Sequence, residues 1–345
     1  MKSGCLLLLA LLGAASGRGE PAAEVIAFNT VGDMLAGDMW DAIYPWDVIV
    51  ALQDFPADWP VVGLGTTSTT FANGEVLALG TAAQPLFHYC DPAYPQRVWP
   101  VTTAMPFLGL AVCDPATRLT CEARPGEELA PQIRAFCQER QLDLAAVLVE
   151  GRLREVGGTI AHDLRKSGSP LTDYGAKTTD YLLPFSSAET AVWQVGGLWA
   201  AGAEPQKSLS IAGHPLHLHA VRADRSRGGH FGRGVVETAT ISVYPLRSVV
   251  VVQGDATARD GRRDGAELVF TVANAGGANI LHLPLALTVP GEAPLAMQLA
   301  GLRPGEAREV RVPIRWADAK AAVTVTLDPA NAVREADEGN NTLVF

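Results

Sequence analysis

The clearest helical pattern in the chain lies between residues 126 and 140. Apolar side chains recur there at the three- and four-residue spacing that places them on one helix face: Leu129, Ile133, Phe136 and Cys137. Residues 61–111 instead carry β-branched and alternating segments broken by Gly and Pro, which predicts strands and turns. More strands are expected at 144–149 and 191–244, and short helical patterns over 24–60. The pattern therefore predicts an α+β fold dominated by strand.

The pattern changes near Pro245. From there on, short apolar segments alternate with turn residues at roughly the 8–12-residue spacing of a β-sandwich, and no helical periodicity intervenes. The seven candidate strands are Ser248–Gln253, Ala266–Ala275, Leu283–Val289, Pro294–Leu299, Arg308–Trp316, Ala322–Leu327 and Thr342–Phe345. This part of the chain is predicted to be an all-β, Ig-like sandwich.

The N-terminus has the pattern of an export signal. Lys2 gives a positive start, an apolar run covers residues 5–12, and small residues suited to cleavage follow. The run is shorter than the ~18 apolar residues that a membrane span needs, and no later segment reaches that length. We therefore predict a secreted protein with a signal peptide at 1–17, a first domain at 18–246 and the sandwich at 247–345.

Composition narrows the classes of partner. Hydrophobic residues make up 48% of the chain and charged residues 19%, which is typical of a globular protein. The formal net charge is −10 and no cluster of Lys and Arg is visible, which argues against a nucleic-acid partner. Export permits disulfides. Cys113 and Cys121 flank a predicted turn, so a local disulfide and two buried thiols both remain open.

Histidines are concentrated in one short segment. The chain has seven, and four of them lie between residues 214 and 230. In a strand, alternate side chains share a face, so His217 and His219 would point the same way. The polar stretch 224–229 suits a hairpin turn, which would bring His230 roughly opposite His219. The spacing therefore predicts three imidazoles converging from two adjacent strands.

Three neutral imidazoles, with water in a fourth position, form an open zinc site of the catalytic type. The competing interpretation is a set of unrelated surface histidines, which this clustering disfavours. His214 precedes Pro215, and we expect it to lie at the surface or to support the ligands without being one. Other metal-binding β proteins, cupins among them, also use such pairs, so the motif does not identify the reaction.

Residues 213–230 resemble the metal segment of bacterial acetolactate decarboxylases, in which HLHF, a DR-containing turn and GGH follow one another. Here Ala220 replaces the phenylalanine. Residues 28–37, 63–80 and 195–198 resemble further segments of that family, in the same order. The resemblance implies a mixed α/β domain, bound zinc and the non-oxidative decarboxylation of 2-acetolactate, or a related branched 2-hydroxy-3-keto acid, to acetoin.

The same resemblance implies roles for two further residues. Glu75 would be the general acid that returns a proton to carbon; the competing interpretation is an exposed hairpin glutamate after the turn pair Asn73-Gly74. An arginine that faces the substrate in the family is replaced here by Thr159. Arg154 is the candidate to compensate if the strand register differs. A further glutamate that the family carries near its C-terminus has no counterpart that we can place.

The tail resembles the CARDB family of Ig-like adhesion modules found on bacterial secreted proteins. The segments that carry the resemblance are 272–276, 302–306, 328–331 and 338–342. The resemblance implies a non-catalytic module for attachment or spacing, with a cell-surface or protein partner. The acidic residues Glu335, Asp337 and Glu338 fit either a calcium site or a solvated turn, and the turn is the favoured interpretation.

Three functions remain open on the sequence. The first is a secreted zinc-dependent carbon–carbon lyase. The second is a catalytically degenerate relative that keeps the metal and acts as a secreted binding or attachment protein, which Thr159 favours. The third is another metalloenzyme, such as a cupin-like oxygenase, that would hold iron, manganese or copper in the same histidines.

Overall fold

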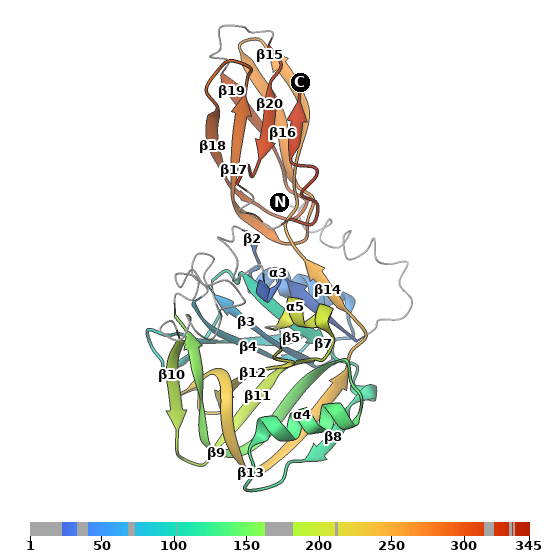
Figure 1. The fold of residues 1–345 in the computed structure, drawn as a ribbon, viewed down its shortest axis with the longest axis vertical. Helices are drawn as coiled ribbons and strands as arrows, with labels where there is room; N and C mark the ends of the chain where they lie inside the picture. The colour runs from blue at the N-terminus through green and yellow to red at the C-terminus, as the bar shows by residue number, and fades with distance from the viewer. Residues whose placement is uncertain are drawn as a thin grey trace. The chain divides into compact units, whose positions relative to one another are not determined.

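The computed structural model describes residues 23–32, 41–67, 73–101, 103–162, 182–210, 213–313, 321–330, 333 and 335–345. The predicted signal peptide lies outside these ranges. The described chain is dominated by strand, as predicted, and divides into two compact units (Figure 1). The first contains the described residues up to Val251 except Asp41–Ala42, which belong with Val252–Phe345 in the second. None of its helices is long and apolar enough to cross a membrane.

In the first unit, the described residues form two antiparallel sheets. One sheet has the order β14-β1-β7-β3-β4-β5-β6 and the other the order β10-β9-β11-β12-β13-β8, with β13 also pairing with β9. The strands of the first sheet are β1 (Glu24–Phe28), β3 (Val61–Thr67), β4 (Asn73–Thr81), β5 (Gln84–Cys90), β6 (Val98–Pro100), β7 (Phe107–Val112) and β14 (Val249–Val252). Those of the second are β8 (Leu119–Glu122), β9 (Leu144–Ala161), β10 (Leu182–Ser187), β11 (Ala191–Ala200), β12 (Leu216–Arg222) and β13 (Gly228–Pro245).

The two sheets face each other across an apolar core. Gly196 of β11 lies so close to the opposite sheet that a Cβ there would come within 3.0 Å of Leu77 and 3.2 Å of Val62. Leu77 and Val62 are fully buried, and each such side chain contributes about 1.5–3 kcal/mol by leaving water. Glycine at this position lets β11 approach β3 and β4, so residues of β4 and β12 can meet between the sheets.

The helices are few and short. They are α3 (Pro45–Ala51), α4 (Leu129–Glu139) and α5 (Ala203–Leu209), with 3-10 turns η1 (Leu52–Asp54) and η2 (Pro115–Thr117). The α4 helix confirms the prediction for residues 126–140, and its predicted apolar face is buried next to β13. Gln132 fixes its start, because the side-chain oxygen accepts a hydrogen bond from the Arg124 amide at 2.7 Å.

The helical pattern predicted over residues 24–60 is wrong for residues 24–28. They form β1, which lies between β14 and β7, and all five side chains are buried. A short apolar run buried on both faces shows no alternation, so periodicity alone cannot separate it from a buried helix.

The second unit is the predicted β-sandwich. Its strands are β15 (Ala256–Asp264), β16 (Glu267–Asn274), β17 (Asn279–Thr288), β18 (Leu295–Leu302), β19 (Ala307–Pro313), β20 (Thr324–Leu327) and β21 (Thr342–Val344), with β2 (Asp41–Ala42) paired to β17. They form one sheet in the order β15-β16-β19 and another containing β18-β17-β20-β21. Phe270, Leu285 and Val325 are among the buried side chains of the core between them.

Two strands of the tail differ from the prediction. Residues 249–252 form β14, which pairs with β1 in the first unit and does not belong to the sandwich. Residues 256–264 form β15, although no strand was expected there. The β15 segment is an edge strand with mostly polar, partly exposed residues, so it carries no apolar alternation for the sequence to reveal.

The local disulfide that the sequence left open is absent from the described structure. Cys90, Cys113, Cys121 and Cys137 are all free thiols. Cys113 is fully buried directly after β7, whereas Cys121 belongs to β8 in the other sheet, so the turn between them crosses from one sheet to the other. The alternative of unpaired thiols therefore holds.

Candidate metal centre

The histidine segment forms the predicted hairpin. His217 and His219 lie on β12, His230 lies on β13, and His219 is directly opposite His230 in the register. Leu218 points to the opposite face of the sheet and is buried. In the turn, the Asp224 carboxylate accepts a hydrogen bond from the Ser226 amide at 3.0 Å. The two strands therefore present three imidazoles on one face.

The three imidazoles converge closely enough to share one ion. One ring nitrogen from each of His217, His219 and His230 lies within 4.8 Å of the others. The ring centroids are 5.0–5.5 Å apart, and the rings are inclined to one another by 43–72°. Inclined rings aim their nitrogen lone pairs at a common point, whereas stacked rings would not.

Backbone carbonyls fix the tautomers of two of these histidines. Nδ1 of His217 lies 2.9 Å from the carbonyl oxygen of Leu209, and Nδ1 of His219 lies 2.7 Å from that of Val76. A carbonyl oxygen only accepts, so each Nδ1 must carry the hydrogen and donate it. Nε2 of both rings is therefore the nitrogen with the free lone pair, as a metal ligand requires.

Burial keeps these rings neutral. Desolvation lowers the pKa of His217 to about 4 and that of His230 to about 3. The pKa of His219 falls well below its usual value through burial and, secondarily, through the neighbouring His217 and His230. Near pH 7 all three imidazoles are unprotonated, and only the neutral ring can bind a metal.

Glu75 lies against this cluster. It is on β4, and its Oε2 lies 3.3 Å from Nε2 of His219. Its Oε1 accepts a hydrogen bond from the Ala161 amide at 3.0 Å. Burial raises the pKa of Glu75 to about 8, so the side chain is mostly protonated at neutral pH. The interpretation of Glu75 as an exposed hairpin residue is therefore wrong, since only 8% of the residue is accessible.

The donor set fits a divalent metal, and zinc in particular. Nε2 of His219 is buried and has no hydrogen-bond partner among the described residues, although a buried imidazole nitrogen normally has one. Three neutral imidazoles, two of them with fixed tautomers, match the ligand set of open, catalytic zinc sites. No thiolate belongs to the cluster, and the neighbouring carboxyl of Glu75 is protonated. These features favour zinc over a hard cation such as Mg²⁺.

The register also places Thr159 and Arg154. Thr159 of β9 is directly opposite His230, beside the predicted metal ligands. Arg154 lies further along β9, opposite Val235, and its guanidinium pairs with the carboxylates of Glu155 and Glu237. These contacts hold the Arg154 side chain at a partly exposed site, paired with two carboxylates. Its role in substrate binding stays a prediction.

Sequence reasoning missed the backbone groups that support the centre. The carbonyls of Val76 and Leu209 orient two rings, and no side chain signals them in the sequence. Close packing of glycines was missed as well. A Cβ on Gly158 would lie 1.9 Å from the carbonyl oxygen of His230, and one on Gly197 would lie 2.0 Å from that of His217. The GG pairs in β9 and β11 are the signal that could have indicated this approach.

Replacing Gly158 with alanine should therefore displace the strand that carries His230. We expect weaker metal binding, by roughly the 10–100-fold that loss of a supporting residue costs. Gly157→Ala is the matched control, because its Cβ would meet its nearest neighbour at an ordinary 3.4 Å. Zinc titration of both variants checks the prediction. Equal affinities in the two variants would contradict it.

Comparison with known proteins gives a family for the tail. Residues 250–345 match the CARDB family. No curated protein matches the chain. Among solved structures, the chain is similar to acetolactate decarboxylase from Bacillus subtilis subspecies spizizenii, at 16% identity and a TM-score of 0.49 over 66% of this chain and 88% of that one.

Two further solved structures cover the same shares of each chain. The alpha-acetolactate decarboxylase of Bacillus subtilis strain 168 is 15% identical, with a TM-score of 0.48. A Staphylococcus aureus protein of unknown function, described as similar to alpha-acetolactate decarboxylase, is 12% identical, with a TM-score of 0.49. At such values the similarity does not identify the reaction, which must be inferred from the side chains of the centre.

Proposed function

We propose that the chain is a secreted, zinc-dependent carbon–carbon lyase that decarboxylates 2-acetolactate, or a related branched 2-hydroxy-3-keto acid, to acetoin or its homologue. The observation that carries the proposal is the buried carboxyl of Glu75, whose Oε2 lies 3.3 Å from Nε2 of His219, one of three converging imidazoles. The arrangement combines a metal site with a proton donor, and this reaction needs both.

The chemistry explains why both are needed. When a β-keto acid loses CO2, the electron pair of the broken bond moves onto the ketone oxygen, and a proton must later reach carbon. Zinc, when bound, supplies a Lewis acid that stabilises the negative charge on that oxygen. His217, His219 and His230 hold the ion through Nε2 of the first two and a ring nitrogen of the third.

Glu75 supplies the proton. Its Oε1 accepts the Ala161 N–H, so the acidic hydrogen belongs on Oε2, the oxygen that faces His219. A pKa near 8 leaves the group protonated at neutral pH yet acidic enough to release the proton, which is the balance that general acid catalysis requires.

A degenerate, metal-binding relative is the second candidate, and Thr159 is the observation that favours it. A threonine beside His230 offers one hydroxyl where an arginine would offer a cation to the substrate carboxylate. Under this alternative the centre keeps its metal without turnover, and the working part of the protein is the CARDB module. We propose attachment to a cell surface or a protein as the role of that module under either function.

The test uses the chain without residues 1–17. Bound metals are measured after purification, and release of CO2 and acetoin is assayed from racemic 2-acetolactate. We expect about one zinc per chain, as for a single three-histidine site, and acetoin formation that stops when the metal is removed. Zinc without turnover would support the degenerate candidate. Iron, manganese or copper in place of zinc would support an oxygenase.

A further inference from the structure

A second group of oxygen ligands lies in the connection between β20 and β21 of the sandwich, far along the chain from the histidines. Asp328 follows β20 directly, and Glu335 and Asn341 lie before β21. Asp328 is 4% exposed, Glu335 7% and Asn341 8%. The amide of Leu327, the residue before Asp328, donates a hydrogen bond to the carbonyl oxygen of Asn341 at 2.8 Å, so these two residues lie beside each other.

Hydrogen bonds within this group use only some of its oxygens. Glu335 accepts from the amide of Ala256 at 2.8 Å and from the side-chain amide of Asn341. Oδ2 of Asp328 accepts from the amide of Val333 at 2.7 Å. The other oxygens, Oδ1 of Asp328, Oδ1 of Asn341 and Oδ1 of Asn340, are buried and have no hydrogen-bond partner in the described structure.

All three unpartnered atoms are acceptors. A carboxylate oxygen and an amide oxygen carry lone pairs and no hydrogen, so they cannot satisfy one another. The orientation of Asn341 is fixed, because its nitrogen must face the carboxylate of Glu335, which accepts. Leaving such oxygens unsatisfied in the interior destabilises the fold. A cation bound by Asp328 and Asn341 would satisfy the free oxygens of both.

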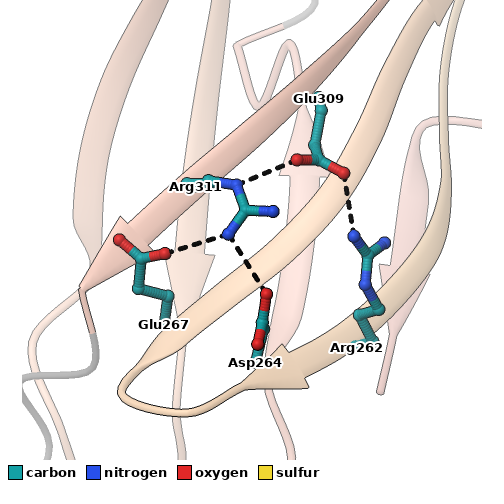
Figure 2. A network of polar contacts seen from close by, with 5 residues as sticks. All are labelled: Arg262, Asp264, Glu267, Glu309 and Arg311. Atoms are coloured by element: carbon teal, nitrogen blue, oxygen red, sulfur yellow. Dashed lines mark hydrogen bonds and ion pairs between the residues drawn. The ribbon is translucent and has the colours of Figure 1, made fainter.

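The rest of the sandwich shows how its carboxylates are normally compensated. Figure 2 shows Arg311 paired with Asp264, Glu267 and Glu309, and Arg262 paired with Glu309, on the exposed face formed by β15, β16 and β19. Within the described ranges no Lys or Arg forms an ion pair with Asp328 or Glu335. The acids of this exposed network therefore have cationic partners, whereas Asp328 and Glu335 have none among the described residues.

We propose that Asp328, Glu335 and Asn341 bind a calcium ion that fixes the connection between β20 and β21. Carboxylate and amide oxygens are the ligands of hard cations, and a set without nitrogen or sulfur donors disfavours zinc. Calcium accepts irregular arrangements of six to eight oxygens, whereas Mg²⁺ demands near-octahedral geometry. This proposal departs from the solvated turn favoured on the sequence: it keeps Glu335 and replaces exposed Asp337 and Glu338 with buried Asp328 and Asn341.

Equilibrium dialysis of the metal-free chain against CaCl2 tests the site. We expect about one calcium per chain, with a Kd of roughly 10⁻⁴–10⁻³ M, as in extracellular calcium modules. Asp328→Asn keeps the size of the side chain and removes its charge, so calcium should bind at least ~10-fold more weakly. Asp264→Asn, which removes a carboxylate from the exposed network of Figure 2, should bind calcium like the unmodified chain.

Thermal unfolding gives a second readout. Calcium should raise the melting temperature of the unmodified chain and of Asp264→Asn, because it binds only the folded state. Without calcium, Asp328→Asn should melt no earlier than the unmodified chain, since it relieves repulsion with Glu335. If the unmodified chain binds no more calcium than Asp328→Asn, or melts at one temperature with and without calcium, water alone fills the site and the proposal fails. Should Asp328→Asn not fold, Glu335→Gln tests the same ligand set.

Discussion

A chain with alanine in place of His217 is expected to lose its zinc. The ligand set falls from three imidazoles to two, and protein zinc sites need three or four ligands. Loss of a residue that only supports a ligand already lowers metal affinity about 10–100-fold. Removing a ligand itself should therefore weaken zinc binding by more than ~100-fold. Metal analysis after purification should therefore fall from about one zinc per chain to near zero.

His214→Ala is the matched control. His214 is exposed, and it lies near enough to His230 that its charge lowers the pKa of that ring, yet it does not belong to the converging cluster. This variant should keep its zinc. Full zinc in the His217 variant, or loss of zinc in the His214 variant, would show that the ligands are wrongly assigned.

The ligand set could be predicted because a strand has a fixed period. Two residues separated by one position share a face, and a short polar turn returns the chain beside itself. These two facts place His230 opposite His219, and the structure has that register. Periodicity also predicted the α4 helix and most strands of the sandwich, because apolar residues recur there at a clear spacing.

The environment of the ligands could not be predicted, because other parts of the chain supply it. The carbonyl of Val76 comes from β4, and that of Leu209 comes from the end of α5. Glu75 follows a common turn pair, so its local sequence indicates an exposed residue. Only the packing of β4 against the second sheet buries it. Likewise, β1 was missed because it is buried on both faces, and β15 was missed because its residues are mostly polar.

Glu75→Gln is expected to keep the metal and lose the reaction. The glutamine oxygen can still accept the Ala161 N–H, so the side chain should stay in place, but an amide has no acidic proton to deliver. Loss of a general acid typically lowers the rate by roughly 10²–10⁴-fold, and we expect kcat to fall in that range. Zinc content should remain near one per chain, because the three ligands are imidazoles. Unchanged kcat would exclude Glu75 as the proton donor, and loss of zinc would make it a ligand.

The stability of the metal-free protein separates the electrostatic role of Glu75 from a purely structural one. Burial raises its pKa from 4.5 to about 8, so between these values the folded state holds a proton that the unfolded state has released. The contribution of Glu75 to the free energy of unfolding should therefore fall as pH rises through this window, at about 1.4 kcal/mol per pH unit. Glu75→Gln carries no such proton, so it should gain stability relative to the unmodified chain from pH 5 to pH 8 and level off above that range. Urea unfolding at both pH values measures the difference. A constant difference would mean that Glu75 is not held protonated in the fold, and the proton would then have to come from another group.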